Sequence, residues 1–180
     1  MNLPNKLTMF RVALIPFFVA FMLIPFGDGA NRYVAVAIFI IASLTDLADG
    51  KIARKYNLIT DFGKFMDPLA DKLLVCSALI CLSGNSIPVW IVIVIISREF
   101  IISGFRLIAS DQGIVLAASW WGKCKTTAQM IMVILLIFDF DLVFFNVLEQ
   151  IFIYLSLALT VISLADYLWK NREVLTKGGM

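Results

Sequence analysis

Long apolar stretches alternate with short polar connections along the whole chain. The apolar stretches lie at about residues 12–26, 33–48, 65–83, 87–109, 116–138 and 142–168, and Gly, Pro, Asn or charged residues separate them. A helix needs about 20 mainly apolar residues to cross the hydrocarbon core of a bilayer. The pattern therefore predicts an all-α, polytopic integral membrane protein with six transmembrane helices.

The composition agrees with a membrane protein and excludes a water-soluble domain. Hydrophobic residues make up 61% of the 180 positions, charged residues make up 16%, and the mean hydropathy is +0.94. Soluble globular chains contain about 45–50% apolar residues. The net charge of +2 is too small to suggest a nucleic-acid partner. Because the chain shows no internal repeat, low-complexity tract or linker, we expect residues 1–180 to form a single membrane domain.

The basic residues predict how the protein is oriented. With six spans, both termini lie on one side of the membrane, and every Lys and Arg except Arg32 falls on that side. By the positive-inside rule, this side is cytoplasmic. We therefore expect a multi-pass protein of the cytoplasmic membrane with both termini inside. The active site is expected at the cytoplasmic ends of the helices, because the polar residues that can carry chemistry gather there.

Four aspartates mark the cytoplasmic ends of the second and third predicted helices. Asp46 and Asp49 are three residues apart, and Asp67 and Asp71 are four residues apart, so each pair lies on one face of its helix. The short connection makes the two helices antiparallel neighbours, which brings the four carboxylates together.

So many negative charges near a membrane need a counterion. Carboxylates favour hard cations such as Mg²⁺, Mn²⁺ or Ca²⁺, and the chain contains no His. Two such ions, about 3.5–4 Å apart, can bridge the phosphates of a substrate. We therefore predict that the four aspartates form a two-metal site.

Small residues and one arginine accompany the aspartates. Gly50, Ala53 and Gly63 each lie one helical turn from one of the carboxylates. They leave space for a bulky ligand such as a nucleotide, and Arg54 is placed to contact its diphosphate. Close packing of membrane helices is the alternative explanation for the small residues.

Together these residues resemble the defining motif of the CDP-alcohol phosphotransferase family, Asp-x2-Asp-Gly-x2-Ala-Arg-x8-Gly-x3-Asp-x3-Asp, and every specified position matches. Members of this family transfer the phosphatidyl or a similar group from a CDP-linked donor to the hydroxyl of an acceptor alcohol and release CMP. The resemblance implies that the four aspartates ligate two Mg²⁺ or Mn²⁺ ions and that Asp71 is also the general base. It further implies a CDP site lined by Asp49, Gly50, Ala53, Arg54 and Gly63.

Three more polar residues are candidates for the CDP site. Asp61 is placed either to accept a hydrogen bond from the cytosine amine or to cap the third helix. Asn5 and Thr8 lie on one face of the first helix, in a segment that resembles the opening of bacterial family members. The alternative is a helix start at the membrane interface, with Lys6 and Arg11 near lipid headgroups.

Basic residues of the fourth and fifth spans are candidates for an acceptor site. Arg98 and Arg106 lie in the fourth span, and Lys123 and Lys125 lie at the start of the fifth. Phosphate is bound by Arg forks and Lys point charges, so these cations favour a phosphorylated acceptor. Contact with anionic headgroups is the alternative role. We expect Glu99 to pair with Arg106 or to orient Arg98 without contacting the acceptor.

Residues 97–106 and 122–127 resemble the corresponding segments of the phosphatidylglycerolphosphate synthase branch of the family. That resemblance implies transfer of the phosphatidyl group of CDP-diacylglycerol to the hydroxyl of sn-glycerol 3-phosphate, giving phosphatidylglycerol phosphate and CMP. It also implies a homodimer in the lipid bilayer. Inositol phosphate, serine or phosphatidylglycerol is the alternative acceptor. Divalent-cation transport is the alternative from another class, and it explains the carboxylates but not the small residues and Arg54.

Overall fold

The computed structural model describes residues 2–25, 27–56, 61–111, 119–140 and 142–172. Within these ranges, the side chains of residues 28, 47–55, 61, 62, 64, 65, 108, 110 and 111 are not described.

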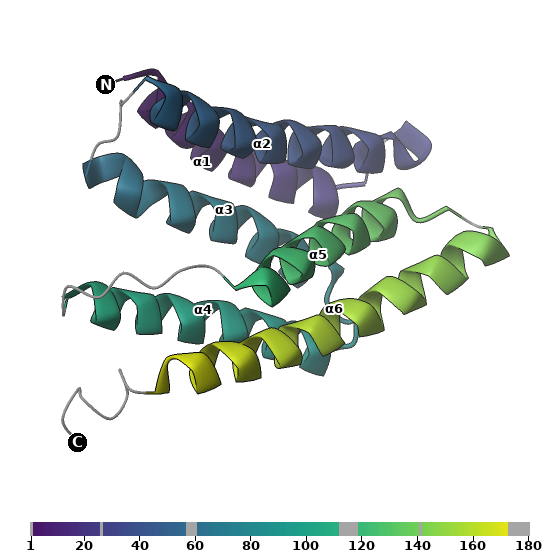
Figure 1. Ribbon diagram of the computed structural model, residues 1–180. Coiled ribbons are helices and arrows are strands. Elements are labelled where there is room, and N and C mark those ends of the chain that lie inside the picture. The colour runs from purple at the N-terminus through teal and green to yellow at the C-terminus, as the bar shows by residue number, and fades with distance from the viewer. Residues whose placement is uncertain (1, 26, 57–60, 112–118, 141, 173–180) are drawn as a thin grey trace. The chain divides into compact units, whose positions relative to one another are not determined.

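The described part of the chain is helical (Figure 1). It contains α1 (Leu3–Leu23), the 3-10 turn η1 (Gly27–Gly29), α2 (Ala30–Lys55), α3 (Asp61–Leu82), α4 (Val89–Asp111), α5 (Trp120–Phe138) and α6 (Val143–Lys170). Each predicted apolar stretch coincides with one of the six α-helices, which confirms the all-α class. The helices α1 and α2 extend well beyond their apolar stretches, because polar residues at one end of each helix continue the backbone hydrogen-bond pattern.

Within the described ranges, three helices are long and apolar enough to cross a membrane: α1, α5 and α6. The other three, α2, α3 and α4, each carry at least four charged residues. These charges include most of the candidate site residues, so the helices that carry the candidates are also the less apolar ones.

The chain divides into two compact units. The first comprises residues 1–83 and 136–139, and the second comprises residues 84–135 and 140–180. The first unit therefore contains α1, α2, α3 and the end of α5, while the second contains α4, most of α5 and α6.

In the first unit, α1 packs against both α2 and α3. Phe18 of α1 and Phe39 of α2 are both fully buried, and their ring centroids are 5.8 Å apart. The chain reverses between α1 and α2 at Gly27 and Gly29, whose φ values of +58° and +96° favour glycine. Asn31 closes this turn, because its Nδ2 donates to the carbonyl oxygen of Phe21 at 3.1 Å.

In the second unit, α4 packs against α6. Ile102, Phe105 and Ala109 of α4 form a buried apolar cluster with Tyr167 of α6. The rings of Phe105 and Tyr167 meet edge to face, with centroids 5.8 Å apart. This cluster holds the C-terminal halves of α4 and α6 together.

Candidate functional site

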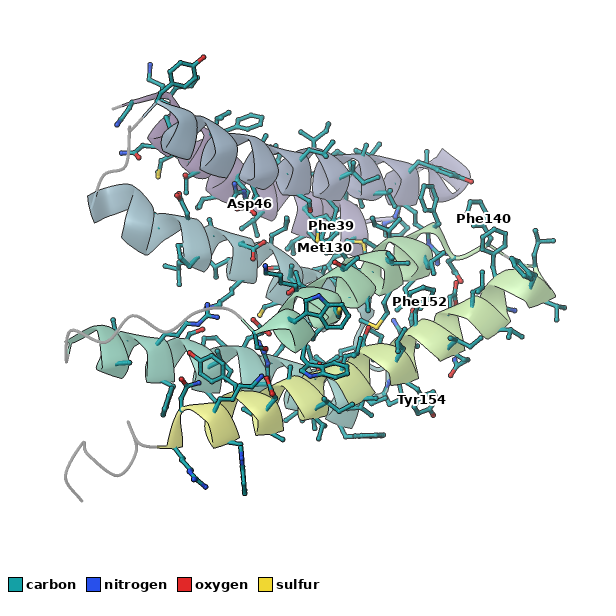
Figure 2. All side chains as sticks on the ribbon, viewed as in Figure 1. Phe39, Asp46, Met130, Phe140, Phe152 and Tyr154 are labelled. Atoms are coloured by element: carbon teal, nitrogen blue, oxygen red, sulfur yellow. The ribbon has the colours of Figure 1, made fainter. Side chains whose placement is uncertain are left out.

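The described aspartates of the motif lie where α1 passes α2 and α3 in the first unit. Asp46 comes from the C-terminal half of α2, and Asp67 and Asp71 come from the N-terminal half of α3. All three side chains are half-buried. Phe39 and Asp46, both labelled in Figure 2, are seven residues apart and both contact residues of α1. The same helix face thus contributes to the core and, two turns later, to the candidate site.

Arg11 of α1 forms an ion pair with Asp46. Its Nη1 lies 2.7 Å from Asp46 Oδ1, and its side chain is 0% exposed. A guanidinium removed from water in this way needs a partner, and the carboxylate supplies one. The structure therefore does not place Arg11 at an exposed headgroup surface, which was the alternative suggested by the sequence. Arg11 was missed as a candidate because its partner lies 35 residues away in the chain.

Thr8 of α1 contacts the second pair of aspartates. Its hydroxyl lies 2.5 Å from Asp67 Oδ1 and 3.1 Å from the carbonyl oxygen of Pro4. The hydroxyl has one proton, and the shorter distance and the charged acceptor favour donation to Asp67. Thr8 is fully buried, and Asn5 is also buried at 7% exposure. One turn of α1 thus holds one oxygen of Asp67, and the next turn holds one oxygen of Asp46.

Part of the sequence-derived site lies outside the described side chains. This applies to Asp49, Gly50, Ala53, Arg54 and Asp61, for which the structure gives only the helical backbone of α2 and the first residue of α3. Gly63 is described and buried.

The described donors fit a hard divalent cation. Asp46, Asp67 and Asp71 offer only carboxylate oxygens, they come from two consecutive helices, and the chain has no His. Among the described side chains, no three acidic, His or Cys residues lie close enough together to hold a metal ion. The two-metal site thus stays a prediction that the donor chemistry supports.

A second polar cluster joins α4 and α5 in the second unit, and we call Arg98, Glu99 and Lys125 the Glu99 cluster. Glu99 Oε1 accepts from Arg98 Nη1 at 3.0 Å and also from Lys125 Nζ. The side chains of Arg98, Glu99 and Lys125 are 10%, 16% and 3% exposed. The expected contact between Glu99 and Arg98 is confirmed, whereas the contact with Lys125 was not anticipated. No periodic pattern links Glu99 to Lys125, which lies 26 residues later.

The first turn of α5 borders this cluster. Ser119 caps the helix, because its Oγ accepts from the backbone N–H of Gly122 at 3.1 Å. A Cβ at Gly122 would lie 3.6 Å from Arg98 Nη2, so the guanidinium lies close to the backbone of this turn. The N-terminus of a helix carries partial positive charge. The two buried cations, Arg98 and Lys125, therefore lie beside a helix end of the same sign, and the region is predominantly positive.

Arg106 takes part in a different contact. Its Nε donates to the hydroxyl of Tyr167 at 3.3 Å, and its guanidinium carbon lies 5.6 Å from the centre of that ring. Arg106 follows Arg98 by two helical turns, or about 12 Å along the helix axis. The expected alternative pairing of Glu99 with Arg106 is replaced by contacts to Arg98 and Lys125. Lys123, the fourth predicted cation, is exposed.

Comparison with known protein families covers the part of the chain that holds these candidate residues. A model of the family described as CDP-alcohol phosphatidyltransferase matches residues 1–162, which include every candidate residue in both units.

Three relatives illustrate the similarity along the chain. A Bacillus subtilis protein named CDP-diacylglycerol–glycerol-3-phosphate 3-phosphatidyltransferase is 48% identical over 97% of this chain and 97% of its own length. A Haemophilus influenzae protein of the same name is 40% identical over 93% of this chain and 91% of its own length. A Mycobacterium tuberculosis protein named probable phosphatidylglycerophosphate synthase is 38% identical over 92% of this chain and 79% of its own length.

Proposed function

The chain belongs to the CDP-alcohol phosphatidyltransferase family and is a transferase, and we propose that it acts on CDP-diacylglycerol and sn-glycerol 3-phosphate. The products are phosphatidylglycerol phosphate and CMP. The names of the relatives describe this donor and acceptor. The structural observation that carries the choice of acceptor is the pair of buried cations, Arg98 and Lys125, since an acceptor with its own phosphate needs such a site.

The donor side of the proposed site is built from the motif residues. Asp46, Asp49, Asp67 and Asp71 would hold two Mg²⁺ or Mn²⁺ ions, which when bound polarise the phosphate and neutralise developing charge. The residues that would bind CDP are Asn5, Thr8, Asp49, Gly50, Ala53, Arg54, Asp61 and Gly63. Thr8 and Arg11 support this assignment, because they hold one oxygen of Asp67 and one of Asp46 from the buried side of the site.

Asp71 is the proposed general base. It lies one turn after Asp67 on α3 and is partly accessible. The acceptor hydroxyl attacks the phosphorus that carries the diacylglycerol, a new P–O bond forms, and the bond from this phosphorus to CMP breaks. The proton of the attacking hydroxyl passes to the Asp71 carboxylate.

The acceptor phosphate is assigned to the basic residues Arg98, Arg106, Lys123 and Lys125. Arg98 supports this strongly, because its Nε is buried and has no hydrogen-bond acceptor among the described residues. A buried donor of this kind calls for an acceptor atom, and phosphate oxygens supply several. Serine carries no phosphate and does not account for this cation pair.

We also propose that all six helices cross the cytoplasmic membrane, with both termini and the active site on the cytoplasmic side. The candidate residues of these helices lie near the end of α2, near the start of α3, in the middle and C-terminal half of α4, and at the start of α5. Under this proposal, consecutive helices would cross the membrane in opposite directions, so these ends would face the same side. A homodimer is part of the proposal through the family resemblance.

The experiment is CMP release by detergent-purified protein supplied with CDP-diacylglycerol and Mg²⁺ or Mn²⁺. Glycerol 3-phosphate, inositol phosphate and serine are added in separate reactions, and far-UV circular dichroism checks that the protein is folded. We expect release with glycerol 3-phosphate alone. Release with another acceptor would reassign the basic residues. Folded protein without release, combined with divalent-cation flux in liposomes, would favour the transport alternative.

A further inference from the structure

One carboxylate oxygen of the Glu99 cluster holds both buried cations. Arg98 Nη1 and Lys125 Nζ both donate to Glu99 Oε1, from two different helices. Glu99 carries the same sign of charge as a phosphate, so it does not itself attract a phosphorylated acceptor. It nevertheless lies between the two residues proposed to bind that acceptor.

The carboxylate offsets an unfavourable arrangement of charges. Two cations that share one oxygen atom lie close together, and their repulsion is weakly screened where the side chains are largely buried. Without Glu99, these side chains would separate or turn toward water. The carboxylate thus keeps the two cations at adjacent positions.

The helix geometry shows why Arg98 needs this contact. Consecutive residues of a helix do not face each other, so α4 alone does not direct Arg98 toward Glu99. The ion pair turns the long Arg98 side chain back, and the guanidinium fits beside Gly122 on α5. Long Arg and Lys side chains lose much rotamer freedom when a ligand fixes them. Here, much of that freedom is already lost before any ligand binds.

We propose that Glu99 is a positioning residue that preorganises Arg98 and Lys125 for the phosphate of the acceptor, without touching the acceptor itself. This inference rests on the proposed function. It makes one carboxylate on α4 a determinant of acceptor affinity, separate from the aspartates that serve the donor.

Substitution Glu99→Gln distinguishes positioning from simple charge attraction. Removing the negative charge leaves two uncompensated cations, so charge attraction alone predicts a lower KM for glycerol 3-phosphate. Positioning predicts the opposite, because the cations are no longer held together. We expect the KM for glycerol 3-phosphate to rise about tenfold, with kcat changed less than about twofold and the KM for CDP-diacylglycerol unchanged.

Three further variants test how the effect arises. Glu149→Gln makes the same chemical change on α6 and should leave both KM values at the wild-type level. Glu99→Asp keeps the charge on a shorter side chain and should restore part of the acceptor affinity. In a Lys125→Gln background, adding Glu99→Gln should raise the acceptor KM by a smaller factor than in the wild type, because the two residues act together.

Inorganic phosphate provides a second readout as a competitor of glycerol 3-phosphate. Its inhibition constant should rise in Glu99→Gln by the same factor as the acceptor KM. An unchanged or lower acceptor KM in folded Glu99→Gln would overturn the proposal, as would an equal rise of both substrate KM values. If Glu99→Gln does not fold, Glu99→Asp replaces it, and a lower acceptor KM or an equal rise of both substrate KM values in folded Glu99→Asp would overturn the proposal. Wild-type protein without glycerol 3-phosphate-dependent CMP release would instead refute the proposed function.

Discussion

Two arginines of the first unit form ion pairs with aspartates in very different surroundings. Arg11 is fully buried and pairs with Asp46, whereas the side chains of Arg32 and Asp139 are 50% and 47% exposed. Exposed ion pairs contribute little to the free energy of unfolding, because water screens the two charges and the long side chains lose entropy when they pair. Removing one partner from a buried pair is costly, because the other charge loses its compensation.

The variant Arg11→Gln should therefore lose about 2–3 kcal/mol of unfolding free energy, a value reduced from the fully buried case because Asp46 is partly exposed. Arg32→Gln is the matched control and should lose less than about 1 kcal/mol. Unfolding in mixed micelles, followed by circular dichroism, measures both. Equal losses in the two variants would show that burial does not determine the contribution of Arg11.

Thr8 helps to orient the Asp67 carboxylate through a single hydroxyl group. The variant Thr8→Val keeps the shape of the side chain and removes the donor to Asp67 Oδ1. Groups that orient a metal-binding carboxylate typically affect metal affinity or activity by about 10–100-fold. We expect Thr8→Val to need a higher Mg²⁺ concentration for half-maximal CMP release, by about tenfold, and Thr8→Ser to behave like the wild type. Identical Mg²⁺ titrations for the Val variant and the wild type would contradict the role of this hydrogen bond.

Among the helices, α5 shows how a local cap supports a distant residue. The hydroxyl oxygen of Ser119 accepts a hydrogen bond from the backbone N–H of Gly122. The same turn borders Arg98 and precedes Lys125. A helix end without a cap frays. The start of α5 thus depends on one hydroxyl group that hydropathy does not detect.

The variant Ser119→Ala should lose about 1 kcal/mol of unfolding free energy, and Ser119→Asp should retain stability. Because fraying loosens the turn beside Arg98, the KM for glycerol 3-phosphate should rise about two- to threefold in the Ala variant. Thermal unfolding and initial rates of CMP release measure the two effects. A loss of stability without any change in the KM for glycerol 3-phosphate would show that the Ser119 cap does not affect the Glu99 cluster.

The sequence predicted where the helices lie but not where each one begins and ends. The apolar stretch that starts near residue 12 corresponds to α1, which begins at Leu3, and the stretch that ends near residue 48 corresponds to α2, which ends at Lys55. The added turns are polar and carry candidate site residues. Hydropathy detects burial in lipid, whereas the backbone hydrogen bonds of a helix continue past the apolar part.

For the whole molecule, the proposed orientation follows from the distribution of charge. All basic residues except Arg32 lie on the side assigned to the cytoplasm, and Arg32 is near the start of α2.

A fusion of green fluorescent protein to the C-terminus should therefore fluoresce in bacterial cells, while an alkaline phosphatase fusion there should be inactive. Fusions after Gly29 should show the reverse, because this turn is placed on the outer side. Fluorescence and phosphatase activity at matched expression levels measure the orientation. Fluorescence from fusions at both positions would contradict the proposed crossing by α1.

The sequence alone determined the helical class, the approximate positions of the helices, the family motif from Asp46 to Asp71 and the concentration of basic residues at alternate ends of the apolar stretches. These features are local, since they depend on spacing within a helix or on counts along the chain. The tertiary structure decided the partners: Arg11 with Asp46, Thr8 with Asp67, Glu99 with Lys125, and Arg106 with Tyr167. These pairs are separated by 35, 59, 26 and 61 residues. Helical periodicity relates residues within one helix only, so the choice of partner depends on how different helices pack together.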